Sequence, residues 1–240
     1  MIVRVGYEWQ NTFFFVRYAS NVHEVRIRFR GANYSDVRAI ISFIEDDLKD
    51  FCTGGLQIRP YQQETAKYGG PVSARSAELL FAADSRSVIA QWGSKPGITQ
   101  AQLTIYVAMS FAMILRMMNG KSWWVSTRNG DWGGNSAVSQ VEFARGKPWQ
   151  DPILESKLGE FFSACSAELD QYRQSLEQYH NTDMERHIAV SSILHMRANR
   201  IFGPSADAEM LARSVLRRIA GDRRWCEHLE QIISMPHGAH

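Results

Sequence analysis

"FFFVRYASNVHEVRIRFRG", residues 13–31, is the stretch that decides the fold, because it is typical of two β-strands joined by a short turn. Its second strand, residues 25–30, alternates apolar residues with arginines. Since strand side chains point alternately to opposite faces, Arg26, Arg28 and Arg30 share one face of the sheet. Cations spaced roughly 7 Å apart repel one another unless an anion or water faces them. The row therefore indicates either a solvated sheet face or an anion-binding surface.

The rest of the first third of the chain also has mixed strand and helix character. Strand composition is found at residues 2–9, 13–18 and 56–61, and apolar residues spaced three and four apart predict a helix at 35–48. Downstream, the apolar spacing predicts helices at residues 74–91, 99–118, 153–179, 184–202 and 206–235. No linker or repeat interrupts the pattern. We therefore expect one domain, residues 1–240, of the α+β class, with an N-terminal antiparallel sheet packed against a mostly helical C-terminal half.

Composition excludes several classes of protein. The chain is 45% hydrophobic and 22% charged, as ordinary globular proteins are. Its net charge of +2 is too small to indicate that it binds nucleic acid directly. The three cysteines, Cys52, Cys165 and Cys226, show no pairing pattern, and the N-terminus has no signal-peptide character. These features predict a cytoplasmic protein.

One uncharged stretch, residues 96–115, imitates a membrane span. Its strongly apolar part covers only residues 103–115 and contains a threonine and a serine. A spanning helix needs about 20 predominantly apolar residues, and this part is shorter. We expect a buried core helix and no membrane span.

The segment "QQETAKYGG", residues 62–70, ends in two glycines that permit a tight turn or a close backbone approach. A helix is expected to follow, and its first N–H groups would be free to bind an anion. Lys67 lies beside this turn. The segment is thus either a structural turn or a further anion site.

Near the end of the chain, "RHIAVSSILHMRANRIFG" spans residues 186–203. On a helix, His187, Ser191, His195 and Asn199 recur every four residues and form one polar stripe. Such a histidine is either a solvated surface residue or a positioned acid or base that Ser191 or Asn199 orients.

Common cofactor motifs are missing from the sequence. It contains no Gly-x-Gly-x-x-Gly, no Walker A pattern, and none of the His-x-x-His or His-Glu-x-x-His spacings. We therefore expect no cofactor and no metal. The segment "WWVSTRNGDWGGN", within residues 122–150, is expected to be a loop that walls or covers a pocket.

Five motifs occur in order between residues 13 and 203: "FFFVRY", "HEVRIRF", "YQQETAKYGG", "AELLFAADS" and "HMRANRIFG". Together they resemble the elimination-type domain of lantibiotic dehydratases, which also occurs in stand-alone thiopeptide biosynthesis proteins. In that family the domain removes glutamate from glutamylated Ser or Thr and leaves a dehydroamino acid. Related stand-alone enzymes instead join two dehydroalanines in a formal [4+2] cycloaddition, which forms a pyridine and expels water and the leader peptide.

The resemblance also implies roles for individual residues. It implies catalytic roles for His195, Arg26, Arg28 and Lys67. It implies substrate-binding roles for Arg30, Tyr68, Asn199 and Arg200. Lys67 departs from the family pattern, which has arginine there; lysine keeps the charge but loses the bidentate fork.

Three functions stay open at this point. Elimination would use His195 as the base and the cations to stabilise anions, whereas cycloaddition would use donors such as Tyr68 in an enclosed pocket. A non-catalytic module would bind a leader peptide along the sheet edge. All three imply a ribosomal precursor peptide with a leader as partner. Elimination further implies a separate glutamylation protein, because no glutamylation domain is found in the sequence. A homodimer is one assembly that the sequence leaves open.

Overall fold

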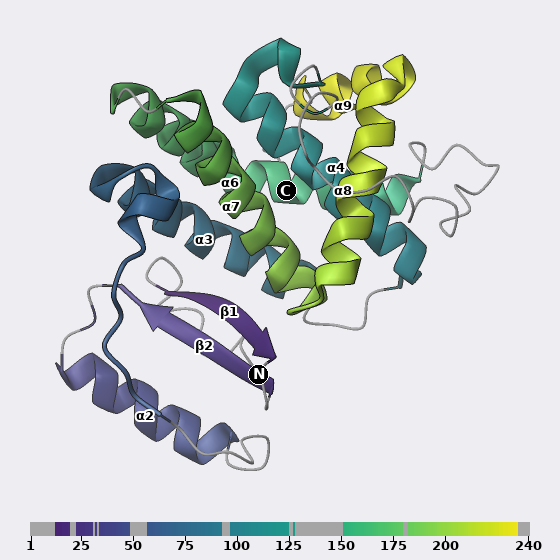
Figure 1. The fold of residues 1–240 in the computed structure, drawn as a ribbon. Helices are drawn as coiled ribbons and strands as arrows, with labels where there is room; N and C mark the ends of the chain where they lie inside the picture. The colour runs from purple at the N-terminus through teal and green to yellow at the C-terminus, as the bar shows by residue number, and fades with distance from the viewer. Residues whose placement is uncertain are drawn as a thin grey trace.

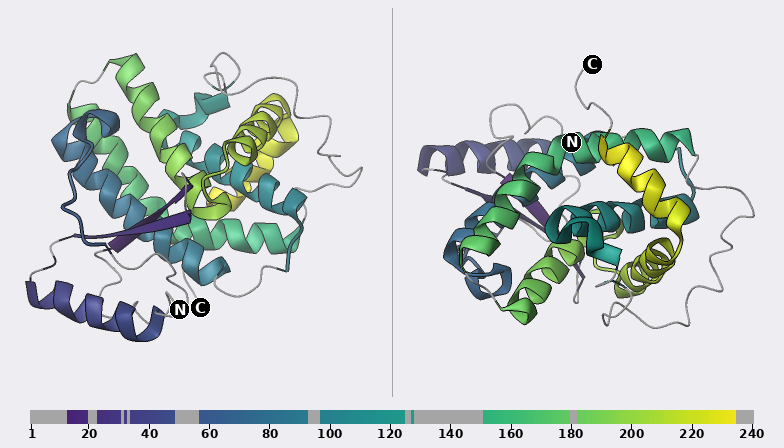
Figure 2. Two further views of the ribbon diagram at one scale, coloured as in Figure 1. Left: turned by 60° about the horizontal axis from the view of Figure 1, so that its bottom comes forward. Right: turned by 90° about the horizontal axis from the view of Figure 1, so that it is seen from above.

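The computed structural model describes residues 13–19, 23–30, 32, 34–48, 57–92, 97–124, 127, 151–179 and 182–234. Within these residues, a two-stranded antiparallel sheet packs against a body of helices, so the predicted α+β class is confirmed (Figure 1). Helix α2 (Tyr34–Leu48) lies on the other side of the sheet from the helical body (Figure 2). The strand expected at 2–9 lies outside the described residues, as does most of the loop expected at 122–150; the described part of that loop, residues 122–124 and 127, is helical.

The remaining elements follow in chain order. The strands are β1 (Phe13–Ala19) and β2 (His23–Phe29). The long helices are α3 (Pro71–Trp92), α4 (Gln100–Asn119), α6 (Pro152–Gln178), α7 (Asp183–Phe202), α8 (Ala206–Gly221) and α9 (Arg223–Ser234). Two short 3₁₀ helices are η1 (Thr65–Tyr68) and η2 (Gly120–Ser122).

The pairing of β1 with β2 decides what the arginine row faces. Phe14 lies opposite Arg28, and Val16 lies opposite Arg26, so these four side chains share one face. Phe14 packs against Phe81 of α3 with their ring centroids 5.5 Å apart, which places this face toward the helical body. The arginines therefore point toward the junction between the sheet and the helices. Val25 and Ile27, on the opposite face of β2, are 56% and 36% exposed.

Strand β1 is fixed by two helices that are far apart in the sequence. The hydroxyl of Ser85 on α3 accepts a hydrogen bond of 3.3 Å from the backbone N–H of Phe15. The side-chain amide of Asn199 on α7 accepts from the N–H of Arg17 at 2.8 Å and donates to its carbonyl at 2.7 Å. Asn199 thus substitutes for a neighbouring strand, and the edge of β1 is covered.

Most predicted helices are confirmed, with two corrections. The short strand predicted at 56–61 is wrong, because residues 57–64 are irregular; Ile58 is exposed, and no described strand lies beside the segment to bond its backbone. The helix predicted at 206–235 is two helices, because the chain is extended at Asp222. The Asp222 carboxylate accepts a hydrogen bond from the N–H of Arg224, as a residue at a helix start does.

Helix α4 is the centre of the core. Its residues from Thr104 to Leu115 are all buried, and it packs against α6, α7, α8 and α9. Among the described residues, Gln100–Ser122 is the one segment long and apolar enough to cross a membrane, and 72% of its most apolar window is buried inside the molecule. The predicted buried core helix is therefore present.

Candidate functional site

A pocket of about 340 Å³ lies where β2, the irregular segment 57–64 and α3 meet. Its lining residues are Phe14, Arg28, Phe29, Arg30, Tyr61, Gln63, Arg75 and Glu78. Two members of the arginine row, Arg28 and Arg30, therefore open onto one cavity, and Arg75 joins them from α3. Sequence reasoning missed Arg75, Tyr61 and Glu78, because nothing in their local pattern shows that α3 packs beside β2.

The pocket is cationic, and no carboxylate among the described residues forms an ion pair with its arginines. The guanidinium of Arg28 lies 5.5 Å from the ring centre of Phe14 and 4.6 Å from that of Tyr61, so aromatic rings hold it in place. Neither Arg28, Arg30 nor Arg75 forms an ion pair with a carboxylate in the part of the chain that the structure describes. Because the described lining residues carry three cations and one carboxylate, Glu78, the pocket favours an anionic ligand.

Arg26 lies apart from the residues that line this pocket. Its Nε atom pairs with the Glu24 carboxylate at 2.6 Å, and its guanidinium lies 4.0 Å from the ring centre of Tyr18. The hydrogen bond from Arg26 lowers the pKa of Glu24 below its ordinary value. An exposed ion pair of this kind contributes little to stability, and a substrate anion could displace Glu24.

The double glycine forms a tight turn after η1. Gly69 and Gly70 have φ angles of +84° and +99°, which only glycine adopts without strain. The predicted structural turn is thus present. Lys67, just before it, lies 3.9 Å from the Glu64 carboxylate and 5.8 Å from the ring centre of Tyr68. Lys67 is half-exposed and is not among the residues that line the pocket.

Tyr68 is buried between the turn and the helical body. Its backbone carbonyl accepts a hydrogen bond from the hydroxyl of Tyr172, and its ring packs edge-on against Phe81 at 5.2 Å. Burial raises the pKa of the Tyr68 hydroxyl, and the positive charges of Arg200 and Arg28 oppose that shift. Tyr68 therefore lies within the electric field of the arginines and keeps its proton at neutral pH.

His195 is paired with a residue that sequence reasoning missed. Its side chain on α7 is 51% exposed, and its Nδ1 atom lies 2.7 Å from the carboxylate of Glu209 on α8. Burial raises the pKa of Glu209, but the hydrogen bond from His195 and the charge of Arg213 outweigh burial, so the pKa lies below its ordinary value. The ionised carboxylate can only accept, so Nδ1 carries the proton and Nε2 can take another. The one local sequence signal that could have indicated Glu209 was its place as an acidic residue in the first turn of α8.

The rest of the polar stripe on α7 has structural contacts. Asn199 binds the backbone of Arg17 on β1, and Ser191 accepts a hydrogen bond from Arg213 at 3.4 Å. Glu209, and not Ser191 or Asn199, therefore holds the His195 ring. His195 is not among the residues that line the cationic pocket.

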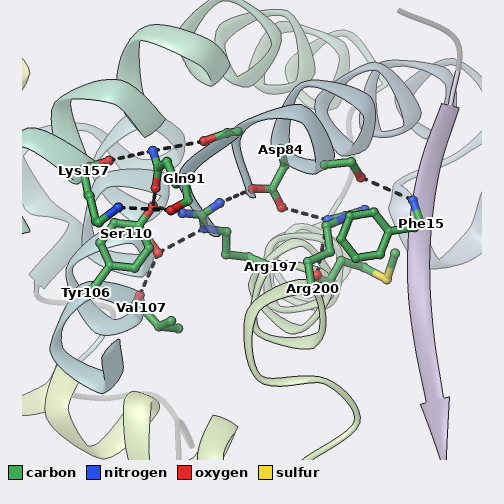
Figure 3. A network of polar contacts seen from close by, with 12 residues as sticks. Phe15, Asp84, Gln91, Tyr106, Val107, Ser110, Lys157, Arg197 and Arg200 are labelled. Carbon is green, nitrogen blue, oxygen red and sulfur yellow. Dashed lines mark hydrogen bonds and ion pairs between the residues drawn. The ribbon is translucent and has the colours of Figure 1, made fainter. Parts of the chain in front are cut away.

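Arg200 belongs to a buried polar network, shown in Figure 3. The carboxylate of Asp84 on α3 pairs with Arg197 and, at 2.8 Å, with Arg200. Arg197 also donates to the hydroxyl of Tyr106 at 2.6 Å. The Nε and Nη2 atoms of Arg200 have no hydrogen-bond partner in the described structure, and burial lowers its pKa. Its guanidinium lies 4.7 Å from the ring centre of Phe81, so it is one layer behind the pocket.

Comparisons with known proteins identify the family. Residues 6–220 match the sequence model described as "Lantibiotic biosynthesis dehydratase C-term". Among solved structures, the chain is similar to the tRNA dependent lantibiotic dehydratase MibB from Microbispora sp. 107891, with a TM-score of 0.69 and 21% identity over 90% of this chain and 25% of that chain. A search of curated proteins found no significant match. The chain thus spans about a quarter of the length of MibB, and this likeness shows the fold. Because the family match covers most of its length, the chain belongs to the lantibiotic biosynthesis dehydratase C-terminal family, which supports a role in modifying ribosomally made peptides.

Proposed function

We propose that this chain eliminates glutamate from glutamylated Ser or Thr in a precursor peptide and leaves a dehydroamino acid. The observation that carries the proposal is the pocket in which Arg28, Arg30 and Arg75 form no ion pair with any described carboxylate. A glutamyl ester carries a free carboxylate and departs as a dicarboxylate. Guanidinium groups bind carboxylates through two parallel hydrogen bonds, so the pocket matches both the substrate and the leaving group.

The proposed reaction assigns a role to each catalytic candidate. His195, held at Nδ1 by Glu209, takes the proton from the substrate Cα at Nε2. The electron pair left on Cα forms the Cα–Cβ double bond, the Cβ–O bond breaks, and glutamate leaves as a carboxylate. Arg26 and Arg28 stabilise the enolate-like charge as it develops, and Lys67 adds a further cation beside the turn.

The other candidates support binding. Arg30 contacts the substrate directly from the rim of the pocket. Tyr68 and Arg200 act from behind Phe81 and add a hydroxyl donor and a buried positive charge. Asn199 contributes through the position of β1, because its amide is used on the backbone of Arg17.

A synthetic peptide with a glutamyl ester on serine tests the proposal. Incubation with the protein should release glutamate and give a dehydroalanine peptide, both followed by mass spectrometry. Arg28→Lys and Arg30→Lys keep the charge and remove the fork, so each should lower turnover by about 10²-fold. Arg223→Lys, at an exposed position on α9, is the matched control and should keep the parent rate. Full activity in both pocket variants would refute the assignment.

A second candidate, [4+2] cyclisation of two dehydroalanines, is favoured by one observation. His195, the base that elimination needs, does not line the pocket, whereas Tyr61 and Glu78 do. A peptide with two dehydroalanines separates the candidates, since a cyclase would expel the leader peptide and form a pyridine. A neighbouring gene that encodes a separate glutamylation protein without an elimination domain would support elimination.

The proposal extends to the setting of the reaction. We infer that residues 1–240 act as one domain in the cytoplasm on a precursor peptide with a leader, after a separate protein has glutamylated it. Homodimerisation, which sedimentation would reveal, is compatible with this scheme, and the reaction needs no metal or cofactor.

A further inference from the structure

The cationic pocket contains one carboxylate that the reaction scheme does not use. Glu78 of α3 lines the pocket, and its side chain is 8% exposed. Its Oε1 atom is buried and has no hydrogen-bond partner in the described structure. A buried carboxylate oxygen without a donor is unfavourable, so a bound ligand that supplies a donor would correct the deficit.

The neighbours of Glu78 hold it in place without neutralising it. The Tyr61 hydroxyl hydrogen-bonds to Glu78, and burial together with the nearby carboxylate raises the pKa of Tyr61. The same Tyr61 ring stacks on the guanidinium of Arg28. Although Arg28, Arg30 and Arg75 line the same pocket, none forms an ion pair with Glu78 within the described ranges. A cationic and an anionic subsite therefore stand side by side around Tyr61.

This pairing of charges matches a free amino acid better than a simple anion. A dicarboxylate would satisfy the arginines but leave Oε1 of Glu78 without a donor. An amino acid with an acidic side chain would satisfy both, because its ammonium group supplies donors to the carboxylate. We propose that Glu78 binds the α-ammonium group of the glutamyl moiety and makes the pocket specific for glutamate over dicarboxylates. This rests on the proposed function and names the part of the substrate that the site recognises.

Titration with two small probes tests this assignment directly. L-Glutamate and glutarate differ only in the amino group, so their affinities, measured by calorimetry, isolate the ammonium contact. The wild-type protein should prefer glutamate by about tenfold, the worth of one charge-assisted hydrogen bond. Glu78→Gln should reduce the preference to within about threefold, mainly by weakening glutamate binding. Glu160→Gln, an exposed glutamate on α6, is the matched control and should keep the full preference.

Kinetics with two peptide esters separate this inference from the proposed function. The peptide carries either a glutamyl or a glutaryl ester on the same serine, and only the first has the ammonium group. Wild type should eliminate the glutamyl ester about tenfold faster in kcat/KM, and Glu78→Gln should erase the difference. If neither ester reacts but the binding preference for glutamate over glutarate still depends on Glu78, the ammonium site is supported and the proposed elimination activity is refuted.

The ammonium site is overturned if wild type binds both probes equally or binds neither, or if Glu78→Gln keeps the tenfold preference. Glu78→Asp retains the carboxylate on a side chain that is one methylene shorter, so its preference for glutamate over glutarate should lie between those of the wild type and Glu78→Gln. That variant keeps the test available if the glutamine variant loses its thermal unfolding transition.

Discussion

The His195 ring takes its orientation from another helix. Glu209 accepts the Nδ1 hydrogen bond and is itself held by Arg213, so the imidazole is fixed although half of it is exposed. His195→Ala should lower elimination of the glutamyl ester by about 10²–10⁴-fold, because it removes a positioned base. Peptide affinity, measured by calorimetry, should hardly change. His195→Phe repeats the loss with ring volume preserved. Turnover within about threefold of the parent would make His195 structural.

The Glu209 carboxylate predicts a pH-dependent stability. Its pKa is lower in the folded protein than in the unfolded chain, so its pairing stabilises the fold above its ordinary pKa of 4.5. That stability is lost as the pH falls through the lowered folded value. The wild type should therefore be more stable than Glu209→Gln at pH 6, and the difference should shrink by pH 3. Urea unfolding at several pH values measures it, and a difference constant with pH would contradict the pairing.

At the residue scale, the sequence predicts which residues share a face of one element better than it predicts which residues of other elements they contact. Alternation in β2 was enough to place Arg28 and Arg30 on one face of the sheet. Arg75 and Glu209 reach their partners only after α3 packs on the sheet and α7 packs on α8. Such contacts depend on tertiary packing, which no local period encodes.

At the scale of elements, one of the two helix attachments of β1 is the side-chain amide of Asn199. Asn199→Ala would leave the N–H and carbonyl of Arg17 without their present partner, which should cost about 1–3 kcal/mol of unfolding free energy. Amide exchange at Arg17 should accelerate as the strand edge loosens. Gln171→Ala, exposed on α6, is a suitable control. Unchanged stability with a raised KM would show instead that Asn199 contacts substrate directly.

Periodicity predicted most elements because their apolar stripes face one core. The long helices α3, α4, α6 and α7 were predicted within a few residues, although α4 is buried on all its faces from Thr104 to Leu115. The break at Asp222 escaped prediction because apolar spacing continues across it from α8 into α9. At residues 56–61 the composition suits a strand, but strands form only where a neighbour supplies hydrogen bonds.

At the scale of the whole molecule, the buried Asp84 carboxylate is the counter-charge of two buried arginines. It joins α3 to α7 by pairing with Arg197 and Arg200. Asp84→Asn should lower the free energy of unfolding by about 3–5 kcal/mol, because two buried guanidinium groups lose their counter-charge. Denaturant unfolding followed by circular dichroism measures the loss. Asp170→Asn, at a partly exposed position on α6, should change the free energy of unfolding by less than about 0.5 kcal/mol. An equal effect of the two substitutions would exclude this role for Asp84.

The double attachment of β1 has a consequence for how the protein is made. Ribosomes deliver the chain from the N-terminus, so β1 emerges early and its second anchor, Asn199, emerges late. Until then Phe14 and Val16, both buried in the finished molecule, lack half of the support that fixes their strand. A nascent chain stalled before α7 should therefore be cleaved by protease near β1, and one stalled well beyond α7 should resist cleavage there. The nascent protein would then depend on translation speed and on chaperones until α7 docks.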